Sequence, residues 1–158
     1  SFAEQLLSDE RAEWIGLGAR DSLRLEAGLP LYGQDLSEEI TPHEAGIIWA
    51  VPKDLRQGGP FIGADSLAEK IAAGRRRMRV ALLPEGRPVR GGTELQDDDG
   101  NAIGEVTSGG FGPTLKGPMA MALVDVAKAD GSIVADMRGK KIPMQRVKPP
   151  FVPHQYKR

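Results

Sequence analysis

Residues 78–108 read MRVALLPEGRPVRGGTELQDDDGNAIGEVTS, and this stretch decides the fold that we expect. Residues 78–83 form an apolar run that ends at a Pro-Glu-Gly turn, and residues 88–96 form a second run that ends at three aspartates and a glycine. The Asp99-Gly100 pair is a strong hairpin signal, because both residue types tolerate positive φ angles. The stretch therefore predicts consecutive antiparallel strands with no helix between them.

The same alternation of short strands and turns continues toward the C-terminus. Further strands are expected at residues 102–108, 119–126, 132–137 and 142–147. Asp130-Gly131 is a second hairpin signal, and a turn is expected near Gly139. Residues 119–126 carry apolar side chains at both alternating positions, which is typical of a strand buried on both faces. The pattern as a whole predicts an antiparallel β-barrel or sandwich.

The first third of the chain predicts helices and strands together. We expect a helix in residues 2–14, a short strand at 15–17, a helix at 19–27 and a buried strand at 46–51. Gly28 follows the second helix as its stop signal. The Gly- and Pro-rich residues 52–60 mark a boundary. The chain is therefore expected to be α+β, with an α/β region in residues 1–59 and an antiparallel β-barrel domain in residues 60–158.

One more helix is expected directly before the barrel strands. Ser66 and Glu69 have capping-box spacing, so Ser66 is expected to begin a helix of about two turns, which ends at Gly74. Residues 75–79, RRRMR, are the only basic cluster in the sequence. They suit either phosphate binding or a solvated helix end whose charges favour the helix dipole. No aromatic side chain alternates with the arginines, which favours the solvated end.

The composition excludes several classes of protein. The 158 residues include 21 Lys and Arg against 22 Asp and Glu, for a net charge of −1, and no Cys. A chain without Cys has no disulfide and no thiol nucleophile, and balanced charge is not typical of a nucleic-acid-binding protein. No apolar run approaches the ~18 residues of a membrane span, so we expect neither a nucleic-acid nor a membrane partner. Because Ser1 opens a helix, we expect a processed or truncated product.

Few side chains suggest chemistry by themselves. Gly16-Leu17-Gly18 lacks the third glycine of a dinucleotide fingerprint, since position 21 is Asp. His43 and His154 are the only histidines and stand apart in the sequence, so no metal site is expected. Arg20 lies at a Gly-rich turn into a helix, where it suits either a clamp on a carboxylate or a surface ion pair. The stiff tail, PPFVPHQY at residues 149–156, is expected to pack back and present Tyr156.

The sequence GLGARDSLRLEAGL at residues 16–29 resembles the aminomethyltransferase family of the glycine cleavage system, the T-proteins. The resemblance continues in the family's order through LYGQD at 31–35, TPHE at 41–44, RVAL at 79–82, PVR at 88–90, IGEVTSG at 103–109 and PFVP at 150–153. One departure is the loop FGPTL at 111–115, where the family reads Ser-Pro-Ser-Leu.

The resemblance implies three domains around a folate channel, the last of them a small antiparallel Greek-key barrel. Residues 1–59 are then a remnant of the central folate-binding α/β region, and residues 60–158 are the C-terminal barrel with its proline-rich tail. The implied reaction moves a one-carbon unit from the aminomethyl-lipoyl arm of the H-protein to tetrahydrofolate and releases ammonia. No metal is implied.

The resemblance also implies which residues bind folate. Arg20 and Tyr156 match positions of the family's folate site, and Arg79 matches a barrel arginine that faces the channel. The family's essential aspartate belongs to an N-terminal half that has no counterpart here, and neither Asp21 nor Asp35 replaces it. We therefore assign no catalytic residue and expect a C-terminal portion of an aminomethyltransferase that is inactive alone.

Three alternatives remain open from the sequence. The chain could be a domain of a related folate-dependent demethylase or dehydrogenase, a barrel that binds nucleic acid through residues 75–79, or a purely structural or carrier-docking module. Under the main interpretation its partners are the lipoylated H-protein and the missing N-terminal half of the same enzyme. Its compartment is the bacterial cytoplasm, or the mitochondrial matrix in a eukaryote.

Overall fold

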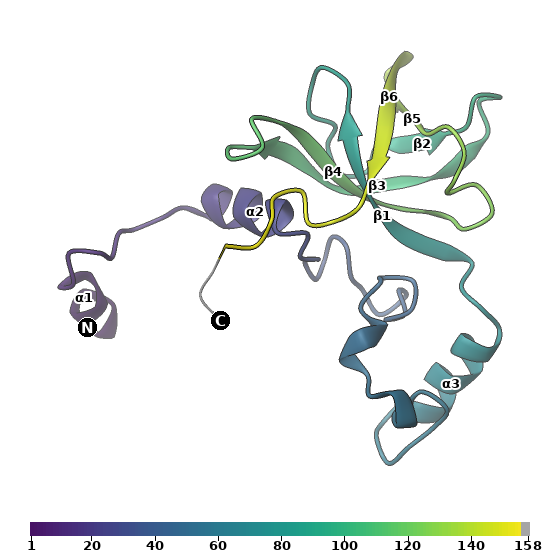
Figure 1. Ribbon diagram of the computed structural model, residues 1–158, viewed down its shortest axis with the longest axis horizontal. Helices are drawn as coiled ribbons and strands as arrows, with labels where there is room; N and C mark the ends of the chain where they lie inside the picture. The colour runs from purple at the N-terminus through teal and green to yellow at the C-terminus, as the bar shows by residue number, and fades with distance from the viewer. Residues whose placement is uncertain (156–158) are drawn as a thin grey trace.

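The computed structural model describes residues 1–155, and its main feature is a closed barrel of six antiparallel strands (Figure 1). The strands are β1 (Arg77–Pro84), β2 (Glu94–Gln96), β3 (Ala102–Gly112), β4 (Gly117–Asp125), β5 (Val134–Met137) and β6 (Lys140–Val147). Their order around the barrel is β1-β4-β3-β2-β5-β6, and β6 pairs again with β1. The expected antiparallel Greek-key barrel is confirmed.

Local turn chemistry sets two of the hairpins. Gly100 has a φ of 83° between β2 and β3, as the Asp-Gly signal predicts. Arg138 and Gly139 both have positive φ angles between β5 and β6, which is the requirement of a two-residue hairpin turn. The hairpin predicted at Asp130-Gly131 is wrong, because β5 pairs with β2 and β6 and not with β4. The turn residues there begin a crossover that completes the Greek key.

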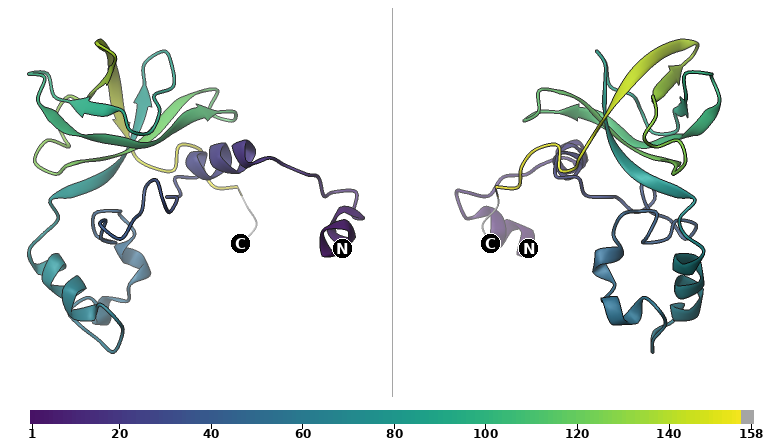
Figure 2. Two further views of the ribbon diagram at one scale, coloured as in Figure 1. Left: turned by 180° about the vertical axis from the view of Figure 1, so that it is seen from behind. Right: turned by 45° about the vertical axis from the view of Figure 1, so that its right-hand side comes forward.

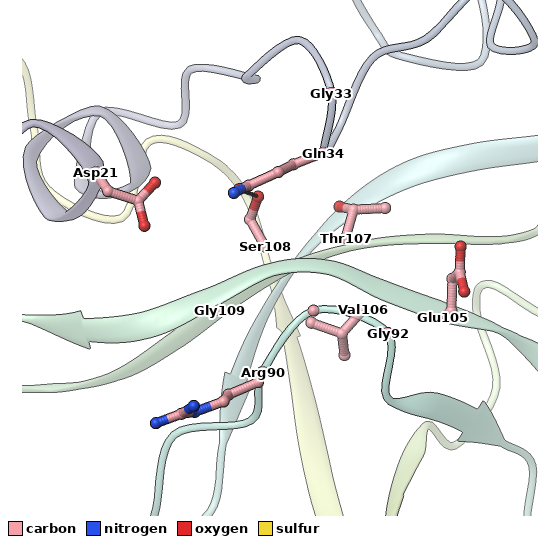
Figure 3. Close-up of a pocket in the computed structure, with 11 residues that line it drawn as sticks. Asp21, Gly33, Gln34, Arg90, Gly92, Glu105, Val106, Thr107, Ser108 and Gly109 are labelled. Carbon is pink, nitrogen blue, oxygen red and sulfur yellow. Dashed lines mark hydrogen bonds between the residues drawn. The ribbon is translucent and has the colours of Figure 1, made fainter. Parts of the chain in front are cut away.

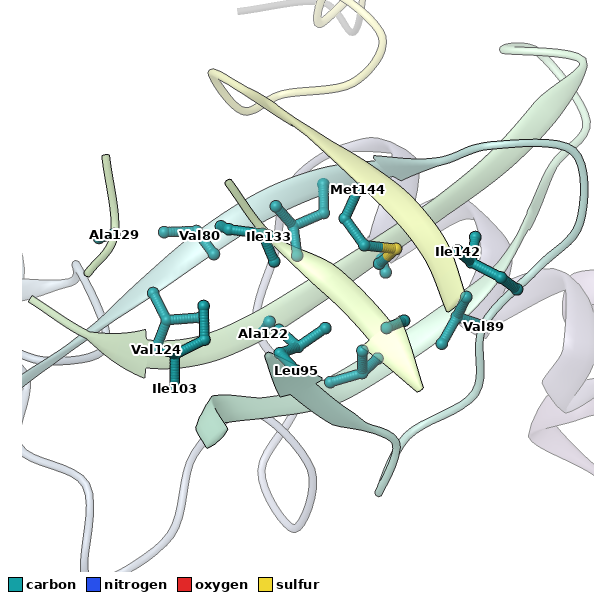
Figure 4. Packing of buried hydrophobic residues seen from close by; sticks show 14 residues of the cluster. Val80, Val89, Leu95, Ile103, Ala122, Val124, Ala129, Ile133, Ile142 and Met144 are labelled. Atoms are coloured by element: carbon teal, nitrogen blue, oxygen red, sulfur yellow. The ribbon is translucent and has the colours of Figure 1, made fainter. Parts of the chain in front are cut away.

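The barrel interior is filled by aliphatic side chains from every strand (Figure 4). Alternate residues of β4, among them Ala122 and Val124, point into this core and are fully buried. The residues between them face outward, where Met119 and Met121 pack against Leu25 of the helix α2 (Leu17–Glu26). Strand β4 is therefore buried on both faces, as predicted, because a helix covers its outer side.

The N-terminal region contains helices and irregular chain but none of the barrel strands. The helix α1 (Phe2–Leu7) is capped by Ser1 and ends well before residue 14, and α2 ends before Gly28, whose φ of 72° confirms the predicted stop. The 3₁₀ turns η1 (Ile48–Ala50) and η2 (Lys53–Leu55) lead to the helix α3 (Ala64–Ala72). Figures 1 and 2 show α1 lying apart from the barrel and α2 lying against it.

Several sequence-based predictions for this region and its border are wrong. Residues 15–17 are not a strand but run into α2, and residues 46–51 are not a buried strand, since they contain η1 and expose Trp49. An apolar run becomes a strand only beside a partner strand, and neither run has one in residues 1–155. Ser66 does not cap its helix, because α3 begins earlier, after Gly63. Of residues 88–96, only β2 is a strand.

No helix within residues 1–155 is long and apolar enough to span a bilayer.

Candidate functional site

The helix α2 is fixed to the barrel by a buried arginine, Arg24. Its side chain is only 9% exposed and forms an ion pair with Asp35, in which Nη1 donates to Oδ2 over 2.6 Å. Its Nη2 also donates to Ser108 Oγ of β3 over 2.9 Å and to Gln34 Oε1 over 2.8 Å. A second ion pair on the same guanidinium joins it to Asp21, one turn earlier on α2. Arg24 thus links the helix, the loop of residues 31–36 and the barrel.

Asp35 is the buried carboxylate at the centre of this network, with no exposed side-chain surface. Besides Arg24, it accepts hydrogen bonds from Thr107 Oγ1 (2.5 Å), Ser108 Oγ (2.9 Å) and the backbone N–H of Leu31 (2.9 Å). Buried charges are tolerated when they are paired and their remaining lone pairs are satisfied. The loop and β3 are therefore held in one relative position.

A pocket of about 470 Å³ opens beside this network, between α2, the loop and β3 (Figure 3). Asp21 points toward it from α2, and Gln34 extends from the loop toward Ser108. Arg90 and Glu105 add one charge of each sign. Such a mixed polar lining suits a ligand with both donors and acceptors.

Glycines bring the segment before β2 against β3 at this pocket. A Cβ atom on Gly109 would overlap the carbonyl oxygen of Val89, and one on Gly91 would lie 2.9 Å from the carbonyl oxygen of Thr107. The backbone N–H of Gly92 donates to the carbonyl of Val106 over 2.7 Å. The wall of the pocket is therefore made by close backbone packing that only glycine permits.

Arg20 lies in the first half of α2 and is exposed. Its side chain has no hydrogen bond or ion pair to another residue within 1–155, whereas the side chain of Arg24 one turn later has several. The surface pair that the charge pattern allowed on this helix is formed by Arg24 and Asp21 instead. The guanidinium of Arg20 is left to face solvent at a rigidly held helix.

Arg79 is half-buried, and backbone carbonyl groups occupy its donors. Its Nε donates to the carbonyl of Ala45 over 2.6 Å, and its Nη1 donates to the carbonyl of Gly28 over 3.1 Å. Burial lowers the pKa of the Arg79 guanidinium, and the nearby charge of Asp35 opposes part of this shift. Arg79 therefore joins β1 to the end of α2, and its contact with folate stays a prediction.

The basic cluster at residues 75–79 is divided between two surroundings. Arg79 points into the fold, and Arg77 pairs with Glu44 over 3.2 Å. Burial raises the pKa of Glu44, but hydrogen bonds from the Thr41 backbone N–H and from Arg77 outweigh it and lower this pKa overall. Arg75, Arg76 and Arg77 are exposed and line a pocket of about 290 Å³.

The C-terminal tail packs along α2, as expected, up to the last described residue. Phe151 packs against the buried cluster of Leu25, Met119 and Met121. The backbone N–H of Val152 donates to the carbonyl of Glu26 over 3.1 Å. A ring nitrogen of His154, Nε2, lies 3.0 Å from the carbonyl oxygen of Ala27. Tyr156 lies outside the described residues, so its predicted place in the folate site is a prediction still.

Sequence reasoning missed the residues that hold the site together. Arg24, Asp35 and Ser108 form one network although up to 84 positions separate them in sequence. The one available signal was the spacing of Asp21 and Arg24, which permits an i,i+3 pair. Among residues 1–155, no group of three or more His, Asp or Glu side chains is arranged to hold a metal ion.

Comparison with known proteins finds relatives of one protein family over nearly the whole chain. Residues 75–153 match the glycine cleavage T-protein C-terminal barrel domain, and residues 4–55 match the GCVT N-terminal domain. The mitochondrial aminomethyltransferase of Pisum sativum is 48% identical over 151 residues, which are 94% of this chain and 37% of that protein. The aminomethyltransferase of Stenotrophomonas maltophilia (strain K279a) is 45% identical over 138 residues, 87% of this chain and 36% of that protein.

A solved structure agrees with the fold. The crystal structure of the glycine cleavage system aminomethyltransferase T from Bartonella henselae matches with a TM-score of 0.89 and 49% identity. The match covers 96% of this chain and 43% of that one, so the chain spans less than half the length of these relatives. The chain belongs to the glycine cleavage T-protein family.

Proposed function

We propose that this chain is the C-terminal portion of an aminomethyltransferase. The whole enzyme would move the one-carbon unit of the aminomethyl-lipoyl H-protein to tetrahydrofolate and release ammonia. The names of the relatives support this activity, and the chain covers 37% of the Pisum sativum protein. The observation that carries the proposal is the buried Arg24–Asp35 pair, which holds α2 against the barrel with Asp21 at a polar pocket. Arg20 is the residue before Asp21 on the same helix, and it is exposed.

The described residues fit part of a folate site. Tetrahydrofolate carries carboxylate groups, and an exposed arginine can bind a carboxylate with two parallel hydrogen bonds. Arg20 has this capacity because its guanidinium is exposed and no other residue within 1–155 accepts a hydrogen bond from it. Tyr156 would follow the tail that α2 holds and form a second wall. Arg79 would support the folate site indirectly, since its Nε and Nη1 already donate to backbone carbonyl groups.

Tetrahydrofolate would supply the nitrogen that accepts the carbon. This chain would contribute position and charge: it would hold the folate against α2 and the pocket wall. Holding two reactants in a productive geometry can lower a barrier by ~7–11 kcal/mol, and this depends on every wall of the site. Because the aspartate that the family resemblance makes essential belongs to an N-terminal half with no counterpart in this chain, we propose that the chain alone does not turn over.

We propose that residues 1–59 complete a central domain and that residues 60–158 form the C-terminal domain. The two family matches fall on either side of this boundary, at 4–55 and 75–153. The partner of the first region would be the N-terminal half of the same enzyme. Exposed apolar side chains support this contact, since Phe2, Trp14 and Leu17 are 74%, 75% and 83% exposed.

We propose the lipoylated H-protein as the second partner, because the reaction requires a carrier of the aminomethyl group. Either compartment expected from the sequence is compatible with the relatives, which include a mitochondrial plant protein and a bacterial one.

A chimera tests the function. The chain replaces the matching region of the Bartonella henselae enzyme, and methylene-tetrahydrofolate formation from loaded H-protein is measured. We expect the chimera to be active and the chain alone to be inactive. In the chimera, Arg20→Ala should raise the KM for tetrahydrofolate roughly tenfold or more without lowering the melting temperature.

The matched control is Arg11→Ala, which removes another exposed arginine, one that pairs with Asp9 before α2. It should leave the KM unchanged. A folded chimera without activity, or equal KM values for the two variants, would contradict the proposal.

A further inference from the structure

Glu26 is a buried carboxylate that the proposed function does not use. It is the last residue of α2 and is 4% exposed. A negative charge at the C-terminal end of a helix is disfavoured by the helix dipole. Helix stability therefore does not explain an acidic residue here, and its contacts outside the helix must.

The side chain of Glu26 binds the loop that joins β3 to β4. Its Oε1 accepts hydrogen bonds from the backbone N–H groups of Thr114 (2.7 Å) and Leu115 (3.0 Å). The last residue of β3, Gly112, lies close to this oxygen, since a Cβ atom on Gly112 would be 2.8 Å from it. One carboxylate oxygen thus fixes the position of a loop 88 residues later in the chain.

The main chain of the same residue binds the C-terminal tail. The carbonyl of Glu26 accepts from the backbone N–H of Val152, and the next carbonyl, that of Ala27, lies 3.0 Å from the His154 ring. Glu26 and Thr114 line a pocket of about 250 Å³ together with Val152 and His154. Figures 1 and 2 both show the tail running beside α2. Glu26 therefore stands where helix, loop and tail meet.

We propose that Glu26 is a positioning residue for the folate site: its carboxylate aligns the β3–β4 loop on α2, beside the tail that its main-chain carbonyl binds, so that this part of the site is assembled before folate binds. The role of folate rests on the proposed function. The positioning itself rests on the two hydrogen bonds that the Glu26 carboxylate accepts from the loop. Pre-assembly would appear as folate affinity and not as the rate of the transfer step, because the group touches no reacting atom.

The test uses three variants of Glu26 and two measurements. Glu26→Gln keeps an oxygen acceptor, Glu26→Leu keeps the volume without an acceptor, and Glu26→Ala removes both. Amide hydrogen exchange is measured on this chain at Thr114 and Leu115, with Ala122 of the barrel core as the internal reference. The KM for tetrahydrofolate and kcat are measured in the chimera.

We expect Glu26→Leu and Glu26→Ala to speed exchange at the two loop amides roughly tenfold or more, while Ala122 is unchanged. The same variants should raise the KM for tetrahydrofolate roughly tenfold with kcat within about twofold of the parent. Glu26→Gln should keep both the loop exchange rates and the KM close to those of the parent. The proposal is overturned if Glu26→Leu leaves the loop amides protected, or if exchange rises equally at Ala122. An inactive parent chimera would refute the proposed function, and the exchange measurement would still decide the alignment.

Discussion

Asp35→Ala tests the buried network that holds α2 to the barrel. The carboxylate is fully buried and receives four hydrogen bonds, from Arg24, Thr107, Ser108 and the Leu31 backbone. Removing it leaves the guanidinium of Arg24, itself 9% exposed, without its buried partner. Breaking a buried ion pair in this way costs about 3–5 kcal/mol.

The comparison is Asp21→Ala, which removes the other carboxylate from the same guanidinium. The side chain of Asp21 is 46% exposed, so solvent compensates its loss and the cost should be at most about 1 kcal/mol. In a domain of this size, 1 kcal/mol lowers the melting temperature by roughly 2–4 °C. We therefore expect a decrease of roughly 6–20 °C for Asp35→Ala.

Urea unfolding followed by circular dichroism gives the free energies. With a slope of about 2 kcal/mol/M, the midpoint for Asp35→Ala should fall by roughly 1.5–2.5 M with the slope unchanged. The double variant Arg24→Met with Asp35→Leu removes both charges and should recover much of the loss. Equal costs for Asp35→Ala and Asp21→Ala, or no recovery in the double variant, would refute the reasoning.

Two further predictions concern the barrel. Gly109→Ala should destabilise the fold by about 1–3 kcal/mol, because its Cβ would overlap the Val89 carbonyl oxygen, whereas Gly110→Ala has open space and should stay within about 0.5 kcal/mol in the same urea assay. The pKa of Asp97 is lowered to about 2, first by the Lys128 ammonium, so the stability it contributes is complete above about pH 4 and is lost as the pH falls toward 2. Lys128→Met should raise that pKa in a carboxyl NMR titration; an unchanged value would contradict the assignment.

The barrel was predictable because its signals are local. Asp99-Gly100 and Gly139 are turn residues whose effect depends on their own φ angles, and both lie in hairpins of the structure. The double burial of β4 also followed from its sequence, since apolar residues occupy both faces. The strand pairing at Asp130-Gly131 could not be predicted in this way. The turn has the same sequence signal as the others, but it connects β4 and β5, which do not pair with each other.

The site was predictable only in part. The resemblance led to Arg20, and the structure places it on an exposed part of α2. Arg24, Asp35 and Glu26 were missed because their partners are brought together by the fold, over 11 to 89 positions in the sequence. From the sequence alone, the charges of Arg24 and Glu26 are typical of a solvated helix and that of Asp35 is typical of an exposed loop, whereas the structure buries all three side chains.

The pairing of β6 with β1 has a consequence for synthesis of the protein. Ala81 lies opposite Val147, so β1 has hydrogen bonds along both of its edges only after β6, the last strand, has been synthesised. Contacts between distant parts of a chain form slowly, and a ribosome adds roughly 5–20 residues per second. The barrel therefore closes late, after β6 has left the ribosome exit tunnel, and until then β1 has an unpaired edge that other strands could join.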